Sequence, residues 1–155
     1  MKQAESAVIE TDLAGLPDCV GEQLGPTAWG EMTQATVDAF AQLTGDHNFI
    51  HVDPVRAGQS PFGGTIAHGF LSLALLAPVT QLLQVSDAAT AINYGLDRLR
   101  FPAPLPVGSR WRASAEVTEV QEISGGRQAR VAARVEVEGS ERPAVVADCL
   151  IRFYA

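Results

Sequence analysis

In the second half of the chain, apolar and polar residues alternate over long stretches, which is the pattern of β-strands with one buried face. The four predicted strands span residues 90–101, 110–123, 127–138 and 143–154. In the third strand Val131, Ala133, Val135 and Val137 fall on one face, and charged residues largely occupy the other. Residues 124–127, Ser-Gly-Gly-Arg, predict a hairpin turn between two of the strands. The pattern therefore predicts an antiparallel sheet.

The first half of the chain has the spacing of helices. Thr33 begins the segment TQATVDAFAQLTG, whose apolar residues recur every three or four positions, and Gly45 stands where a left-handed residue commonly ends a helix. Asp46 should therefore follow this helix directly. Asp53 and Pro54 predict a helix cap followed by proline at the first helical position, which opens one further short turn.

Residues 68–84, HGFLSLALLAPVTQLLQ, are apolar on nearly every side, which is typical of a buried helix, although Pro78 should bend or interrupt it. Short helices, one wholly apolar helix and then long strands indicate an α+β protein. A single hot-dog fold, in which an antiparallel β-sheet wraps around a central apolar α-helix, would bury both. We expect an N-terminal segment over residues 1–20 and one hot-dog domain over residues 21–155.

The composition is that of an ordinary globular protein, with 46% hydrophobic and 19% charged residues among 155, which suits a single domain. The net charge of −7 argues against a nucleic-acid or anionic-membrane partner, because either would require a basic surface. The sequence has neither an apolar run of membrane-spanning length nor a secretory signal at its N-terminus. Cys19 and Cys149 form no CxxC motif, which favours reduced thiols in a cytoplasmic protein.

Polar side chains gather in the segment TGDHNFIHVDP, directly after the predicted end of the helix. Asp46 and His51 could form a general acid/base pair, since a carboxylate and an imidazole that lie close together poise each other. The alternative is that Asp46 and Asn48 serve only as turn residues, as Asp53 is expected to serve only as a helix cap.

A metal site is a further alternative, because His47 and His51 have the i, i+4 spacing of helical metal ligands. However, Asn48 follows His47 at the position where a zinc protease has its glutamate base. Gly45 and Pro54 also leave little room for a regular helix between them. We therefore expect no metal.

His68 and Gly69 begin the apolar helix, where backbone N–H groups have no intrahelical acceptor and carry partial positive charge. Glycine allows a ligand to approach the backbone closely. The pair is therefore a candidate oxyanion hole for a thioester carbonyl. The alternative is that Gly69 serves only the close packing of helix and sheet.

The chain resembles a known family through long motifs in the same order. F-A-x-L-T-G-D-x-N-x-I-H-x-D-P at residues 40–54 resembles the hydratase-2 motif of MaoC-like (R)-specific enoyl-CoA hydratases and dehydratases. G-x-T-I-A-H-G-F at residues 63–70 resembles the start of their hot-dog helix. Together with Y-G-L-x-x-x-R-F-P-A-P-x-P-V-G-S at residues 94–109, these segments are similar to the nodulation-protein-N-like branch. The resemblance covers roughly residues 20–155.

The resemblance implies roles for individual residues. Asp46 and His51 match the catalytic pair of the family, and Gly69 matches the glycine whose N–H polarises the thioester carbonyl. Asn48 matches the asparagine that maintains the site geometry. Phe49 replaces the usual proline, so the resemblance does not define the local path of this loop. A serine that contacts the thioester arm in some relatives aligns with Ala77, so that contact should be absent here.

The implied function is reversible addition of water to a trans-2-enoyl thioester, carried by CoA or by an acyl carrier protein, with no metal or redox cofactor. The resemblance further implies a homodimer. The substrate pocket is expected to include Phe49, Ile50, Phe62, Ile66 and His68.

For the CoA phosphates, Arg98 and Arg100 are candidate partners and Arg56 a weaker one, unless these are simply solvated surface arginines. Two alternative functions stay open. One is a hot-dog acyl-CoA thioesterase, because the fold serves both chemistries. The other is a non-catalytic subunit that binds acyl thioesters.

Overall fold

A computed structural model describes residues 7–155 of the chain, so the first six residues of the expected N-terminal segment lie outside the described part. The main sheet has six strands in the order β2-β6-β7-β8-β5, with β3 also pairing with β6, and every pairing in it is antiparallel. The strands of this sheet are β2 (Gln23–Leu24), β3 (Gly30–Glu31), β5 (Thr90–Arg100), β6 (Arg110–Ile123), β7 (Gly126–Val137) and β8 (Val145–Tyr154). The antiparallel sheet and its four long strands are therefore confirmed, with boundaries that differ by at most two residues.

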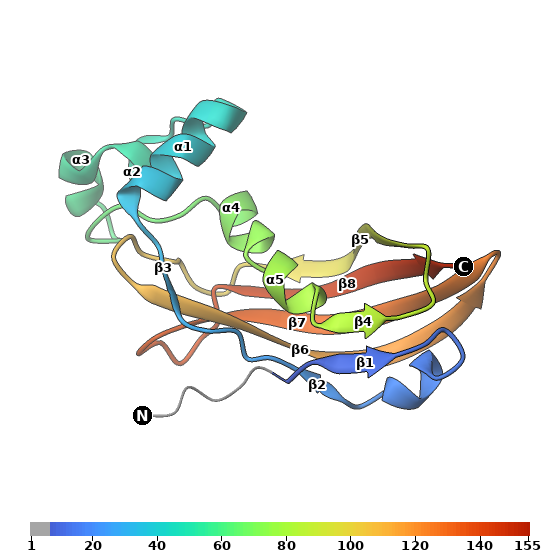
Figure 1. Cartoon of the computed structure of the whole chain (residues 1–155). Coiled ribbons are helices and arrows are strands. Elements are labelled where there is room, and N and C mark those ends of the chain that lie inside the picture. The colour runs from blue at the N-terminus through green and yellow to red at the C-terminus, as the bar shows by residue number, and fades with distance from the viewer. Residues whose placement is uncertain (1–6) are drawn as a thin grey trace.

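A smaller parallel sheet and several short helices complete the fold. Strand β1 (Ile9–Thr11) pairs with β4 (Leu83–Val85). The helices are η1 (Leu16–Cys19), α1 (Gln34–Thr44), α2 (Phe49–Val52), α3 (Pro54–Gly58), α4 (Gly69–Ala74) and α5 (Ala77–Thr80). Figure 1 shows α4 and α5 over one face of the long strands and α1, α2 and α3 together beyond one end of the sheet. None of the helices in residues 7–155 has the length and apolar character needed to span a membrane.

The core lies between α4, α5 and the inner face of the sheet. The predicted inward residues Val131, Ala133, Val135 and Val137 are all buried, because alternate residues of a strand point to the same face. Leu16 in η1 is fully buried in the same cluster. The described part of the N-terminal segment therefore packs into the core of the rest of the chain.

The apolar segment at residues 68–84 is interrupted near Pro78, as predicted, but it is not a single helix buried on every side. The segment forms α4, α5 and then strand β4. Helix α4 ends at Ala74, four residues before Pro78, because a proline ring clashes with the carbonyl of residue i−4 and supplies no N–H to it. Pro78 instead lies in the first turn of α5, where its missing N–H costs nothing. Phe70 is 73% exposed, so this segment is not buried on every side.

Candidate active site

The position of Asp46 follows from how α1 begins and ends. The Thr33 side chain accepts a hydrogen bond from the Thr36 N–H at the start of the helix. At its end Gly45 has φ 77°, in the left-handed region, and donates its N–H to Ala41 O at 2.8 Å. Both ends agree with the predicted helix. Glycine is favoured at such a φ because it has no Cβ, and the chain leaves the helix with Asp46 as its next residue.

Asn48 starts the short helix α2, which carries His51. The Asn48 side chain is 3.4 Å from the Ile50 N–H and acts as the helix cap, while the Asn48 N–H is 3.3 Å from Asp46 Oδ1. Asn48 therefore connects the Asp46 loop to the His51 helix. These two hydrogen bonds are long, but the Asn48 carbonyl also accepts from the His51 N–H at 2.9 Å. Asp46 and Asn48 are exposed, whereas His51 is buried.

Two hydrogen bonds orient His51. Its Nδ1 lies 2.7 Å from Ile66 O. Because a carbonyl only accepts, Nδ1 donates its hydrogen, and Nε2 of the neutral ring keeps a lone pair. The backbone carbonyl of His51 accepts from Gln34 Nε2 at 2.8 Å, and Gln34 Oε1 accepts from the Thr65 hydroxyl at 2.6 Å. His51 is thus held with one ring nitrogen able to accept a proton.

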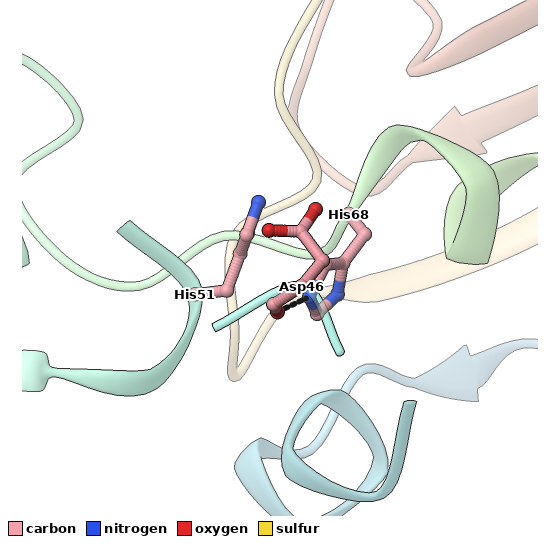
Figure 2. Close-up of side chains that lie close together, drawn as sticks. All are labelled: Asp46, His51 and His68. Carbon is pink, nitrogen blue, oxygen red and sulfur yellow. Dashed lines mark hydrogen bonds between the residues drawn. The ribbon is translucent and has the colours of Figure 1, made fainter. Parts of the chain in front are cut away.

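Asp46, His51 and His68 come together in one group (Figure 2), in which one polar atom of each residue lies within 4.8 Å of those of the other two. His47 is not part of it and is exposed. The three side chains could in principle supply ligands to a metal ion. The two imidazoles, however, are stacked, with centroids 3.9 Å apart and an interplanar angle of 27°. His51 Nδ1 and His68 Nε2 are already hydrogen-bonded to backbone carbonyls, so only the other nitrogen of each ring could serve as a ligand.

A cavity of about 400 Å³ opens beside His51. Its walls are formed by Ile50, His51, Phe62, Ile66, Ala67, Gly69, Ser72, Phe101, Pro102, Ala103, Pro104, Leu105 and Ala144. Ile50, Phe62 and Ile66 from the predicted pocket therefore lie here. Phe49 does not, because its ring lies under the Arg56 guanidinium, 4.3 Å from it. His68 does not line this cavity either, because it is buried behind Asp46 and His51.

The wall formed by residues 101–105 was not expected from the sequence as part of the site. This connection between β5 and β6 has the sequence FPAPL. Its apolar side chains and prolines were a visible signal of a rigid apolar surface, but nothing in the local pattern shows that it lies against His51. It supplies five of the residues that line the cavity, all of them non-polar.

Gly69 is the first residue of α4, and the first intrahelical hydrogen bond there runs from the Ser72 N–H to His68 O. The Gly69 N–H therefore has no acceptor within the helix. A Cβ on Gly69 would lie 3.0 Å from the Phe101 ring, so close packing also favours glycine. The two interpretations of Gly69, carbonyl binding and close packing, are compatible with each other.

The remaining sequence candidates lie away from the cavity. Arg98 Nε is 2.6 Å from Asp148 Oδ2. Asp148 stands between Ala147 and Cys149, whose side chains are buried in the core, so this ion pair is on the outer face of the sheet. Arg100 Nη1 donates to Leu99 O. Neither arginine is a wall residue of the cavity beside His51.

Neither thiol is suited to act as the nucleophile. Cys19 and Cys149 are both buried and unbridged. Burial raises the pKa of Cys149 to about 11, with a smaller contribution from the charge of Asp148. Burial also raises the pKa of Cys19. Because the thiolate is the reactive form, both groups stay unreactive near neutral pH.

Comparison with known proteins identifies the family. The family profile described as "MaoC like domain" matches residues 17–140. The "3-hydroxyacyl-thioester dehydratase Z" of Mycobacterium tuberculosis is 50% identical over 145 residues, which cover 92% of this chain and 96% of that protein. "Nodulation protein N" of Rhizobium leguminosarum bv. viciae is 42% identical over 143 residues, covering 90% and 89%.

A solved structure agrees with these relatives. The "(R)-hydratase from A. caviae involved in PHA biosynthesis" superposes with a TM-score of 0.71 at 29% identity, over 85% of this chain and 94% of the other. This similarity confirms the hot-dog fold expected from the sequence. The chain therefore belongs to the family of MaoC-like dehydratase domains, as the motifs at residues 40–54 and 63–70 indicated.

Proposed function

We propose that this protein is an (R)-specific enoyl-CoA hydratase, or 3-hydroxyacyl-thioester dehydratase, which adds water reversibly to a trans-2-enoyl thioester. The observation that carries the proposal is that the Asp46 carboxylate lies beside the His51 ring. His51 in turn lines a cavity whose wall includes Gly69. The dehydratase and hydratase names of the relatives support the same reaction. The chain is then a hydro-lyase that needs no redox cofactor, since an α,β-unsaturated thioester is already an electrophile.

In the proposed reaction Asp46 and His51 share one water. One of the two groups accepts a proton as the water oxygen bonds to Cβ. The π electrons of the double bond move toward Cα and the thioester carbonyl, and a proton is then returned to Cα. His51 is suited to this because Ile66 O holds the hydrogen of Nδ1 and leaves Nε2 to face the reacting water. The Gly69 N–H stabilises the enolate-like oxygen.

A turnover assay tests the proposal. Incubation with crotonyl-CoA or a longer trans-2-enoyl-CoA near neutral pH should remove the absorbance of the enoyl thioester, and chiral analysis should find the (R)-3-hydroxyacyl product. Asp46→Asn is the matched control, and its turnover should be slower by about 10²-fold or more. Absence of turnover with short, medium, long and branched enoyl-CoA, and with enoyl carrier-protein substrates, would refute the function. Release of free thiol from a saturated acyl-CoA would instead indicate a thioesterase.

The same proposal includes a homodimer in the cytoplasm. Strand β5 is at the end of the main sheet, and within residues 7–155 it pairs only with β8. It exposes Ile92, Tyr94 and Leu96 by 46%, 54% and 39%. A long edge strand with apolar side chains is commonly covered by another chain, and a second copy of β5 would cover this one. Two buried, unbridged thiols are in keeping with a reducing compartment.

A further inference from the structure

His68 contacts both members of the Asp46–His51 pair, although it lies on neither of their elements. Its Nε2 is 3.0 Å from Asp46 O, a residue 22 positions earlier. Its ring is stacked on that of His51, with centroids 3.9 Å apart, and it also contacts the Phe40 ring of α1 at 5.0 Å. His68 is only 2% exposed. One buried side chain therefore connects the Asp46 loop, α2 and α1.

The two ring nitrogens of His68 have different hydrogen-bonding roles. The Asp46 carbonyl only accepts, so His68 Nε2 donates its N–H to it. Its Nδ1 is buried and has no hydrogen-bond partner among residues 7–155. The ring is therefore held through the Nε2 hydrogen bond and through its packing against the two neighbouring rings. Figure 2 shows this hydrogen bond as the dashed line between His68 and Asp46.

The backbone of His68 is fixed more firmly than the Asp46 loop. The His68 carbonyl accepts from both the N–H and the hydroxyl of Ser72, at 2.9 and 3.0 Å, which ties it to the first turn of α4. Asp46, in contrast, is exposed, and its N–H is 3.4 Å from Thr44 Oγ1. The short hydrogen bond to His68 thus links the loop to α4, whose first residue is Gly69.

We propose that His68 is a positioning residue, which fixes Asp46 and His51 relative to each other and to the Gly69 N–H. The inference rests on the proposed function, because it takes Asp46 and His51 as the catalytic pair. A displacement of about 1 Å between reacting groups can lower a rate by about 10²-fold. The hydrogen bond from Nε2 and the ring stack together restrict that displacement, and His68 itself does not line the cavity beside His51.

Three substitutions at His68 separate the hydrogen bond from the ring. His68→Gln places an amide N–H donor at the reach of Nε2 and should keep kcat within about tenfold of the wild type. His68→Phe keeps a ring to stack on His51 but has no donor, and His68→Asn is too short to reach the Asp46 carbonyl. Both should lower kcat by about 10²-fold, with KM changed by less than about threefold. The matched control is His47→Gln, at the exposed neighbouring histidine, which should leave both constants unchanged.

Nitrogen-15 NMR of the wild-type histidine rings provides a readout without substrate. It should place the hydrogen of His68 on Nε2 and that of His51 on Nδ1. The inference is overturned if folded His68→Phe or His68→Asn retains near wild-type kcat, if His68→Gln loses as much activity as they do, or if the His68 hydrogen is on Nδ1. A wild-type protein that turns over no enoyl thioester would refute the proposed function, while the NMR result would still test the hydrogen bond itself.

Discussion

At the residue scale, Asp46 and His51 act on one water in the proposed reaction and should behave as a unit. Asp46→Asn keeps the size of the side chain but removes its charge, and His51→Gln removes a titrating ring. Each substitution should lower kcat by about 10²-fold or more, the scale usual for acid/base groups. The double variant should lose much less than the product of the two effects. Steady-state kinetics on variants shown to be folded by circular dichroism measure this.

The neighbouring His47 tests whether the pair has been assigned correctly. His47→Ala should retain wild-type kcat, because its side chain is exposed and is not part of the Asp46, His51 and His68 group. Dialysis against a chelator should also leave the activity unchanged, since the proposed reaction uses no metal. Loss of activity in both experiments would contradict the Asp46–His51 mechanism and favour a metal site instead.

Cys149 is expected to couple stability to alkaline pH. Its pKa is raised from 9.0 in the unfolded chain to about 11 in the folded protein, chiefly by burial. Because the folded protein holds the thiol proton more tightly, this group contributes its full stabilisation below the unfolded pKa. The contribution is lost as the pH rises through the folded pKa. The free energy of unfolding should therefore fall more steeply between pH 9 and 11 in the wild type than in Cys149→Ala. Urea titrations at several pH values measure the free energy of unfolding of both proteins. If it fell with pH equally in the wild type and in Cys149→Ala, the raised pKa of Cys149 would be contradicted.

At the element scale, Gln34 links the first turn of α1 to α2 and to the chain before α4. Its amide donates to the His51 carbonyl and also to Asp38 Oδ1, both at 2.8 Å, and its carbonyl accepts from Thr65. Gln34→Ala leaves a buried hydroxyl and a partly buried carbonyl without these partners, so the free energy of unfolding should fall by about 1–3 kcal/mol.

Asp38→Ala is the control for this prediction. It removes only the i, i+4 contact to Gln34 on the surface of α1, so it should cost less than about 0.5 kcal/mol. Chemical denaturation of both variants gives the two values. Equal losses in the two variants would show that Gln34 acts within α1 alone and does not hold α2.

At the scale of the whole molecule, the exposed edge of β5 predicts self-association. Light scattering at micromolar concentration should give about twice the mass of the chain. Ile92→Lys places a charge on this edge and should shift the protein toward the monomer, since charged residues on edge strands oppose pairing. Val20→Lys, at an apolar residue that is similarly exposed and lies outside the sheet, is the matched control. A wild-type monomer would contradict the dimer.

Local chemistry in the sequence was sufficient for several parts of this structure. Thr33 and Gly45 define the ends of α1 through hydrogen bonds to residues at most four positions away, so the position of Asp46 directly after the helix could be predicted. The alternation in β7 likewise predicted which side chains are buried. In both cases the determining interactions are short in sequence or repeat with the period of the backbone.

The tertiary structure decided what depends on contacts between distant segments. The stack of His68 on His51, the wall formed by residues 101–105 and the outward direction of Arg98 all follow from how the helices pack on the sheet. Pro78 was visible in the sequence, but the apolar run around it equally suited one bent helix or the two helices and strand that form. Hydrophobic periodicity indicates which face of a helix or strand is buried, but not which other segment packs against that face. These contacts could therefore not be predicted from the sequence alone.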